Sequence, residues 1–280
     1  MEERKYPRLR TVDKSLPPFA LNNFPTGFAF TLGREIVYLL ATKGKAILEG
    51  NEWEDIFAKC IGAEWKPSNV GLDDVILGNT AWGAKTVKAT SPSKAVKVRL
   101  ISGRNSPVYS FGETIDTTAD PNALGAHILD IWNQRVSAVR EKFQTLRTVV
   151  LVKSNDLSEV VVFEFDTIRY DPELFVWDWN KNGNLVGYET SKKAHRFTWQ
   201  PHGSQFTIIE EIPEKSLVIK IRKPEIVDKD KIMEALGFDK SWVAVTHKEA
   251  EAKGKVAIDL DDPDIETDMG GLIAVEPDAS

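Results

Sequence analysis

The chain has 280 residues, of which 42% are hydrophobic and 28% are charged, proportions typical of a globular protein. Its formal charge is −6, but eight acidic and no basic residues lie between Asp259 and Asp278, so residues 1–258 carry 36 basic and 34 acidic side chains. With a net charge of only +2 in that part, any surface for nucleic acid has to be a local basic patch. The single cysteine, Cys60, excludes an internal disulfide framework and a cysteine-rich zinc site.

Several common segments and motifs are absent from the sequence. No run approaches the roughly 18–20 apolar residues of a membrane-spanning helix, and the first residues lack the apolar core of a signal peptide. We therefore expect an intracellular protein that has no membrane partner. A GxxxxGK[ST] phosphate loop and a G-x-S-x-G elbow are also missing, which argues against a nucleotide cofactor and against an esterase.

The N-terminal part has little periodicity. Residues 1–31 contain several prolines and predict an extended arm or loop. Residues 34–40 predict a short helix, which a Lys-Gly-Lys sequence ends or interrupts.

A clearer helix is expected over residues 51–62. Asn51 and Glu54 fit a capping box, in which the Glu54 carboxylate reaches back to the Asn51 amide, and Gly62 is a suitable terminator. Apolar side chains recur at helical spacing and predict one buried face, formed by Trp53, Ile56, Phe57 and Cys60. Glu54 lies at the edge of that face and has two interpretations, a structural cap or a carboxylate carried to a site on the next element.

Residues 71–88 predict a β-hairpin. Two short apolar runs are joined at Gly78-Asn79, a pair suited to a two-residue type II′ turn because glycine accepts the positive φ at its first position. Counting outward from this turn fixes the register, in which Asp74 faces Gly83.

That register places Asp74 and Lys85 on one face of the sheet, about 7–8 Å apart as diagonal neighbours. Since Gly83 has no side chain, the space between them is expected to be open. The pair indicates metal-assisted chemistry, with Asp74 binding a hard cation and Lys85 assisting a nucleophilic water or its charged transition state. Asp73 points to the opposite face and is the second choice. The pattern is also consistent with an ordinary strand start and a lysine on a solvated face.

The next strand is expected at residues 95–101, where apolar and basic side chains alternate as in a half-exposed strand. Lys97 and Arg99 fall on its exposed side, and Lys94 comes just before it. These three side chains are the best group for contacts with phosphates, which supply affinity without specificity.

The longest helix is expected at residues 121–146. It opens at Asp120-Pro121 and carries apolar residues at steps of three and four through Leu146. The later elements are expected to be two buried strands, a further strand and a short helix, at residues 148–152, 159–165, 217–221 and 227–236.

Residues 166–224 hold three tryptophans and several Asn and Gly, and we expect irregular loops and short strands there, laid on the same core. The predicted organisation is one domain over residues 1–254, with its core at about 50–165 and an elaboration at about 166–250. The acidic segment 255–280 is expected to be a flexible tail.

From residue 51 to residue 153 the expected order is helix, two-stranded hairpin, third strand, long helix and fourth strand. With Asp74 entering the first strand and Lys85 on the second, this order resembles the PD-(D/E)xK nuclease superfamily and, within it, the type II restriction endonucleases. The resemblance covers about a hundred residues. It implies an α/β (α+β) fold in which helices flank a central mixed β-sheet, in the order α-β-β-β-α-β, and a prokaryotic, cytoplasmic protein.

Members of this superfamily carry an aspartate on the first strand and an acidic residue two positions before a lysine on the second. Asp74 and Lys85 match the first and last of these, whereas Gly83 stands at the middle position and has no carboxylate. The resemblance implies catalysis by Asp74, Lys85 and Glu54, with Mg²⁺ held by Asp74, by the Ala84 carbonyl and by Glu54 in place of the missing acid. Gly83 also leaves open an inactive descendant.

The resemblance further implies sequence-specific hydrolysis of phosphodiester bonds in double-stranded DNA, by a homodimer because paired active sites usually cut symmetric duplex sites. Side chains that reach base edges are typically Arg for guanine and Asn or Gln for adenine. The candidates are Arg104, Asn105, Gln200, His202, Ser204 and Gln205. Two other functions stay open, a non-catalytic DNA-binding or interaction module on a decayed nuclease fold and a DNA repair or recombination nuclease.

Overall fold

The structure is a computed structural model that describes residues 16–67, 71–112 and 120–246. The chain divides into two compact units, residues 1–226 and residues 227–280. This boundary differs from the expected single domain over residues 1–254, and the expected acidic tail at 255–280 lies outside the described residues. In the second unit the described side chains are all at least partly exposed, and they form helix α5 (Lys229–Leu236) and the 3₁₀ turn η4 (Lys240–Trp242).

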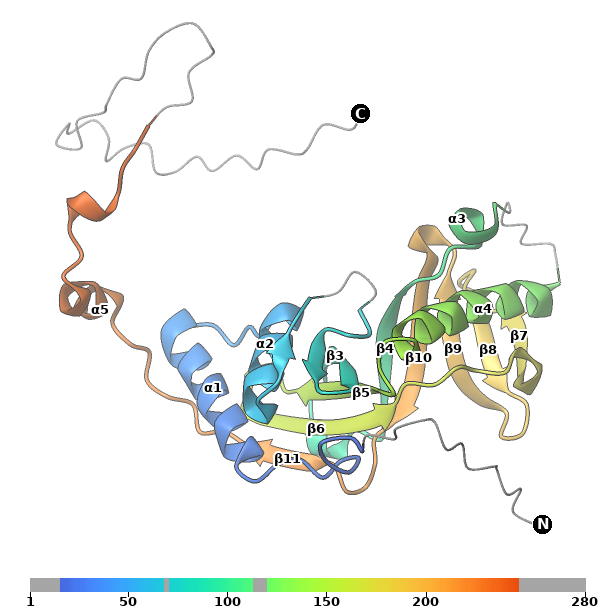
Figure 1. The fold of residues 1–280 in the computed structure, drawn as a ribbon, viewed down its shortest axis with the longest axis horizontal. Helices are drawn as coiled ribbons and strands as arrows, with labels where there is room; N and C mark the ends of the chain where they lie inside the picture. Colours follow the sequence, from blue (N-terminus) through green and yellow to red (C-terminus); the bar gives the residue numbers. More distant parts are fainter. Residues whose placement is uncertain (1–15, 68–70, 113–119, 247–280) are drawn as a thin grey trace, which may run out of the picture. The chain divides into compact units, whose positions relative to one another are not determined.

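A mixed six-stranded sheet runs through the first unit in the order β1-β2-β3-β5-β6-β11 (Figure 1). Strands β3 and β5 are parallel, and the other neighbouring pairs are antiparallel. The strands are β1 (Glu64–Trp65), β2 (Val75–Leu77), β3 (Thr80–Lys88), β5 (Thr145–Lys153), β6 (Glu159–Asp166) and β11 (Leu217–Lys220). The expected mixed central sheet is therefore present.

Two adjacent helices cover one face of this sheet, α1 (Phe28–Lys43) and α2 (Gly50–Ile61). Their apolar stripes pack on alternate residues of the central strands, among them Trp82, Ala84 and Val149. The extended arm was expected through residue 31, but α1 begins at Phe28, so the last four residues of that expected arm are helical. The amphipathic stripe of α1 starts with Phe28 and Leu32, earlier than the short helix expected at 34–40.

A second, antiparallel sheet has the order β4-β10-β9-β8-β7. Its strands are β4 (Lys97–Arg104), β7 (Phe175–Trp179), β8 (Leu185–Glu189), β9 (Ala194–Gln200) and β10 (Gln205–Glu211). The short strands expected within residues 166–224 are therefore present, but four of them form a regular sheet with β4 where irregular loops were also expected. The predicted third strand, β4, belongs to this sheet and not to the central one. Helices α1 and α2 cover one face of the central sheet, and apolar residues of β4 and of the long helix at residues 121–140 pack on the other.

Helix α4 (Pro121–Arg140) packs against the second sheet, as Figure 1 shows. Its first turn is capped by Asp120, as expected, but the helix ends at Arg140 and not at Leu146. Leu146 lies on β5, where it pairs with Ala81 of β3 in the parallel ladder. The shorter elements are α3 (Pro107–Phe111), η1 (Pro92–Lys94), η2 (Pro172–Leu174) and η3 (His202–Ser204).

The contact between α4 and β7 depends on a missing side chain at Gly125. A Cβ at this position would lie 2.3 Å from the ring of Trp177, which is far inside van der Waals contact. The indole is buried and packs in the same cluster as Phe197 and Trp199. Gly125 therefore stays in a helix interior, where glycine is otherwise unfavourable, because only glycine lets the helix and the sheet approach this closely.

Replacing Gly125 by alanine should lower the free energy of unfolding by about 1–3 kcal/mol, because the added methyl group overpacks the Trp177 contact. The matched control is Gly33→Ala in α1, where the nearest atom would lie 4.0 Å away. That change should stabilise the protein by about 0.4–1 kcal/mol. Urea unfolding of both variants measures the difference, and an equal response at the two sites would contradict the packing assigned to Trp177.

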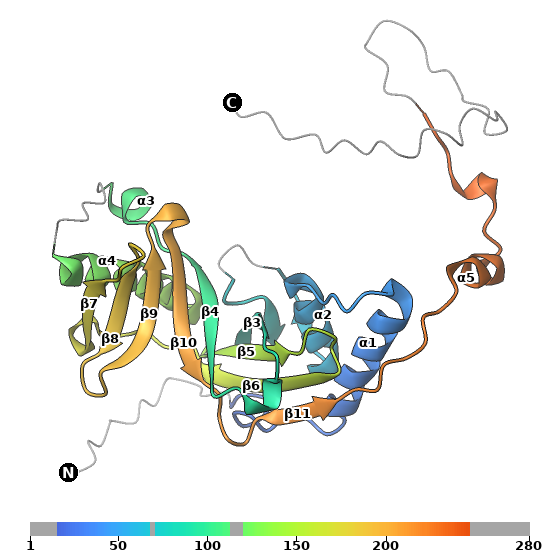
Figure 2. The same ribbon diagram turned by 180° about the vertical axis from the view of Figure 1, so that it is seen from behind.

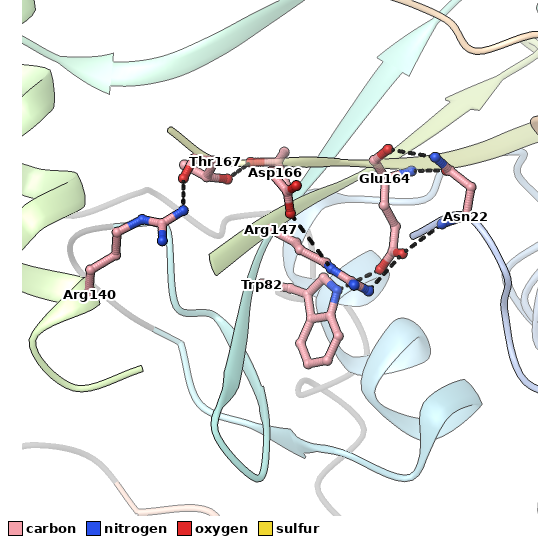
Figure 3. A network of polar contacts seen from close by, with 8 residues as sticks. Asn22, Trp82, Arg140, Arg147, Glu164, Asp166 and Thr167 are labelled. Atoms are coloured by element: carbon pink, nitrogen blue, oxygen red, sulfur yellow. Dashed lines mark hydrogen bonds and ion pairs between the residues drawn. The ribbon is translucent and has the colours of Figure 1, made fainter. Parts of the chain in front are cut away.

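A buried carboxylate joins the N-terminal segment to the central sheet (Figure 3). Glu164 of β6 is fully buried and accepts hydrogen bonds from the Trp82 indole at 2.6 Å and from the Arg147 guanidinium at 3.3 Å. The Asn22 side chain accepts from the Glu164 amide at 2.5 Å and donates to its carbonyl at 2.9 Å. Burial raises the pKa of the Glu164 carboxyl, and the positive charge of Arg147 opposes that rise.

Arg147→Met should cost about 3–5 kcal/mol of stability, because it leaves the Glu164 carboxylate buried without its counter-charge. Thermal and chemical unfolding at pH 7 measure this loss. The control is Arg34→Met, which breaks an exposed ion pair with Glu35 and should cost less than about 0.5 kcal/mol. A loss at Arg147 no greater than that of the control would show that the network does not carry the stability assigned to it.

Candidate active site

The predicted hairpin is confirmed residue by residue. Strands β2 and β3 are antiparallel, with Val75 opposite Trp82 and with Leu77 opposite Thr80. Gly78 has φ +58°, and Asn79 is not among the described residues with positive φ. A positive φ at the first turn position alone is the property of a type II′ turn, as the sequence predicts.

Asp74 and Lys85 lie on the same face, opposite α1 and α2. Val75 and Ala84 pack under those helices. Because side chains alternate between the two faces of a sheet, Asp74, next to Val75, and Lys85, next to Ala84, point to the other face. Asp74 is only 3% exposed, and its carboxylate is 3.4 Å from the backbone nitrogen of Ala84, a long hydrogen bond. The structure thus brings together three of the predicted site residues at the start of β2.

The space beside Gly83 is not open, which corrects the sequence-based expectation. A Cβ at Gly83 would lie 3.0 Å from the Gly71 carbonyl oxygen and 3.1 Å from the Leu72 Cα atom. The chain entering β2 therefore passes directly over Gly83. This position carries glycine because the backbone fills the place of a side chain, and an acidic residue there would require Gly71 and Leu72 to move.

The Lys85 ammonium is half-buried and donates a hydrogen bond of 3.0 Å to the Gly71 carbonyl. Burial lowers the pKa of Lys85, and the negative charges of Asp74 and Glu54 oppose this shift. The positive charge of Arg135 lowers the pKa further. The lysine therefore lies within electrostatic range of both predicted carboxylates, and the group holds its proton less tightly than a solvated lysine does.

Glu54 is not the cap of its helix. Glu49 is the N-cap of α2, and the Glu52 carboxylate accepts the reciprocal hydrogen bond of 2.8 Å from the Glu49 amide. The predicted capping box of Asn51 and Glu54 was therefore wrong, because the observed box lies two residues earlier in the chain. Glu54 is thus free of the capping role that the sequence suggested.

The Glu54 carboxylate accepts a hydrogen bond of 3.2 Å from the indole nitrogen of Trp65. Trp65 lies on β1 and pairs with Val75, the residue directly after Asp74. Together with the effect of its charge on Lys85, this contact puts Glu54 beside the start of β2. Trp65 was missed from the sequence because its two-residue strand is too short to show periodicity.

The oxygen donors at this place fit a hard cation. The Ala84 amide points towards Asp74, and since the N–H and C=O of a strand residue face the same side, its carbonyl does too. Mg²⁺ typically takes one or two carboxylates together with substrate phosphates. Asp74 and the Ala84 carbonyl are adjacent oxygen donors of this kind, and no group of three or more His, Cys, Asp or Glu residues that could hold a metal occurs within residues 16–67, 71–112 and 120–246.

Asp73, the second choice, has one carboxylate oxygen that is buried and makes no hydrogen bond within the described residues. A buried carboxylate oxygen without a partner costs free energy, and a cation or an ordered water would satisfy it. Asp73 is thus a further oxygen donor in the segment that enters β2.

Arg135 of α4 is a site residue that the sequence did not reveal. Its guanidinium donates hydrogen bonds to the Ser102 carbonyl at 2.6 Å and to the Asn105 side chain at 3.2 Å, and it lies over the Trp132 ring. Burial lowers the pKa of Arg135. In the sequence, Arg135 is one polar residue between the apolar positions of a helix, and such residues usually face solvent.

The predicted contacts with DNA fall into two separate places. Lys94, Lys97 and Arg99 are exposed around the first residues of β4, and Lys97 forms an ion pair with Glu211. Arg104 is exposed at the other end of the strand, about 23 Å from Lys97 at the usual rise per residue. The remaining candidates adjoin Arg104 and are at least partly exposed, namely Gln200, His202, Ser204 and Gln205.

Asn105 cannot contact a base in this structure, contrary to the sequence-based expectation. It is 0% exposed, and its side chain donates to the Ile128 carbonyl at 2.9 Å and accepts from Arg135. Its backbone is also bonded, because its amide donates to the Ser204 carbonyl and its carbonyl accepts from the Trp199 indole. Asn105 is a structural residue that joins β4 to α4 and to the turn between β9 and β10.

Comparisons with protein-family models, with curated proteins and with solved structures each found no match. Among the described residues, no helix is both long enough and apolar enough to cross a bilayer.

The burial of Lys85 predicts a pH-dependent cost in stability. Because its pKa in the folded state is lowered, the charged form is disfavoured in the fold, and this cost fades as the pH rises through the folded pKa towards the ordinary value of 10.5. The wild-type protein should therefore gain stability relative to Lys85→Met between neutral and alkaline pH, by an amount on the order of 1 kcal/mol.

Urea unfolding of both proteins at a series of pH values measures this difference. Lys88→Met is the matched control, since it removes an exposed lysine from the same strand and should change stability by less than about 0.5 kcal/mol throughout. A difference between wild type and Lys85→Met that does not vary with pH would contradict the burial of the ammonium group.

Proposed function

We propose that this chain is an Mg²⁺-dependent, sequence-specific endonuclease of the type II restriction type, which hydrolyses phosphodiester bonds in double-stranded DNA. One observation carries the proposal, namely that the half-buried Lys85 ammonium shares a sheet face with Asp74 and lies within electrostatic range of the carboxylates of Asp74 and Glu54. Those are the residue types that the nuclease chemistry requires, and the register of the hairpin keeps Asp74 and Lys85 on one face.

In this function, Asp74, Glu54 and the Ala84 carbonyl would hold the cation. When bound, Mg²⁺ supplies polarisation of the scissile phosphate and acidifies a water. Lys85 orients that water or takes its proton, and its lowered pKa suits this role because the buried ammonium gives up its proton more readily than a solvated lysine does. In its charged form the same group offsets the charge that builds up on the phosphorus.

The proposed partner is duplex DNA, and the proposed assembly is a homodimer. Exposed basic side chains on β4 provide the local patch that phosphate contacts need, since residues 1–258 carry a net charge of only +2. Two copies related by a two-fold axis would present two hairpin sites to the two strands of a symmetric sequence. A repair or recombination nuclease would use the same residues on other substrates.

A second function is favoured by Gly83. The close approach of Gly71 and Leu72 to this glycine fills the place of the acidic residue of the superfamily motif. A chain that lost its second acid could remain a DNA-binding or interaction module without catalysis. The two functions differ in whether Glu54 acts as the second acid.

Incubation of the purified chain with unmodified phage DNA, in Mg²⁺ and in EDTA, tests the proposal. Discrete fragments should form in Mg²⁺ alone, and Asp74→Asn, Lys85→Ala and Glu54→Gln should each slow cleavage by about 100-fold or more. The matched control is Asp55→Asn, which removes the neighbouring carboxylate of α2 that pairs with Lys59. That variant should cleave within a few-fold of the wild-type rate.

Each other outcome points to a different conclusion. Cleavage that survives Glu54→Gln but not Asp74→Asn would support the nuclease and contradict the metal-binding role of Glu54. Absence of cleavage with DNA binding retained would favour the non-catalytic module. Cleavage in EDTA would contradict the metal-dependent mechanism.

A further inference from the structure

One end of the second sheet carries a row of three polar side chains. Gln205 of β10 pairs with Arg104 on one side and with Gln200 on the other. Residues paired across neighbouring strands point to the same face, so these side chains stand next to one another. We call this row, with the η3 turn between β9 and β10, the sheet tip. Figure 2 shows β4, β9 and β10 side by side, with α3 beyond the end of β4.

Backbone hydrogen bonds of Asn105 hold the sheet tip in place. The buried Asn105 follows Arg104 directly, and its amide donates to the Ser204 carbonyl at 2.9 Å, which ties the end of β4 to the η3 turn. The Trp199 indole donates to the Asn105 carbonyl at 2.8 Å. Since Asn105 and Trp199 are buried, they hold the backbone that carries the exposed side chains in place, as a recognition element requires.

The turn itself has an unusual conformation. Ser204 has φ +52°, a left-handed conformation that costs free energy in a residue other than glycine. The neighbouring Gly203 has φ +79°, and His202 is exposed beside it. The backbone strain at Ser204 puts its carbonyl where it accepts the Asn105 hydrogen bond, and this places Gln205 in the row.

The charges and rings around the tip suit a polyanion. Residues 102–111 and 200–206 contain Arg104 and no aspartate or glutamate. On α3, Tyr109 is 91% exposed, the most exposed of the large hydrophobic side chains described. An exposed aromatic ring beside a basic side chain is a common arrangement on surfaces that contact nucleotides.

We infer that the sheet tip reads base edges in the major groove of duplex DNA, with Arg104 on guanine and with Gln205 and Gln200 on adenines. This inference rests on the proposed function and names its specificity-determining residues. The axes of neighbouring strands are about 4.8 Å apart, so the ends of two of them, with the side chains of Gln205 and Arg104, match the two-stranded ribbon that a major groove about 12 Å wide admits. A bidentate guanidinium matches the two acceptors of guanine, and a side-chain amide matches the donor and acceptor of adenine.

The test is selection of bound sequences from a library of randomised duplexes. Ca²⁺ replaces Mg²⁺, so that binding is measured without cleavage. The wild-type chain should select a site that contains guanine and adenine at fixed positions. Arg104→Ala should lose about 10- to 100-fold of the discrimination at one guanine and keep the rest of the site. Arg104→Lys should lose the same discrimination, because lysine keeps the charge but not the bidentate fork.

One control and one further variant separate base-specific contacts from non-specific electrostatic binding to DNA. Arg222→Ala removes an exposed arginine just after β11 and should leave the selected sequence unchanged. Gln205→Ala should relax a position next to the one that Arg104→Ala relaxes. If Arg104→Ala instead weakens binding to all duplexes equally and lowers the salt dependence by about one phosphate contact, Arg104 contacts the backbone and the inference is overturned.

The remaining outcomes distinguish this inference from the proposed catalysis. A chain that selects a sequence through Arg104 but never cleaves it would support the sheet tip as the reader and contradict the nuclease. If the chain cleaves at a specific sequence, and Arg104→Ala and Gln205→Ala leave that sequence unchanged, the nuclease is supported and the sheet tip is not the reader. Absence of binding to any duplex would overturn both.

Discussion

The fold depends on one buried carboxylate. Glu164 lies inside the first unit, where an unpaired charge would be very costly, and its carboxylate is tolerated because β3, β5 and the N-terminal segment each supply a donor. Asn22 and Glu164 are separated by 142 positions in the sequence. The network therefore ties the N-terminal segment to the central sheet.

The same constraint extends to the candidate active site. Trp82, which donates to Glu164, is three residues before Lys85 on the same strand. The indole fixes β3 on the helix-covered face, and the alternation of side chains then fixes Lys85 on the other face, next to Asp74. The position of Lys85 next to Asp74 on one face of the sheet thus depends on the buried hydrogen bond between Trp82 and Glu164 on the opposite face.

The parts of the fold that follow from local chemistry could be predicted from the sequence, and those that depend on distant partners could not. The Gly78 turn fixes the hairpin register within four residues, so the prediction that Asp74 and Lys85 share a face was correct. The pattern of β4 gave its two faces but not its neighbour, because β10 lies about 100 residues later. Asn105 has the composition of a solvated loop residue, and only the buried partners Ile128 and Arg135 reveal its structural role.

Arg135 links the sheet tip to Lys85. One guanidinium holds the base of the sheet tip through Ser102 and Asn105, and its charge is felt by the proton on Lys85. A ligand at the tip that shifts this guanidinium would change the proton affinity of Lys85. Linkage is reciprocal, so protonation of Lys85 would change the affinity for that ligand by the same factor. In the proposed nuclease, the pH would then change the affinity of the sheet tip for DNA, and bound DNA would change the protonation of Lys85.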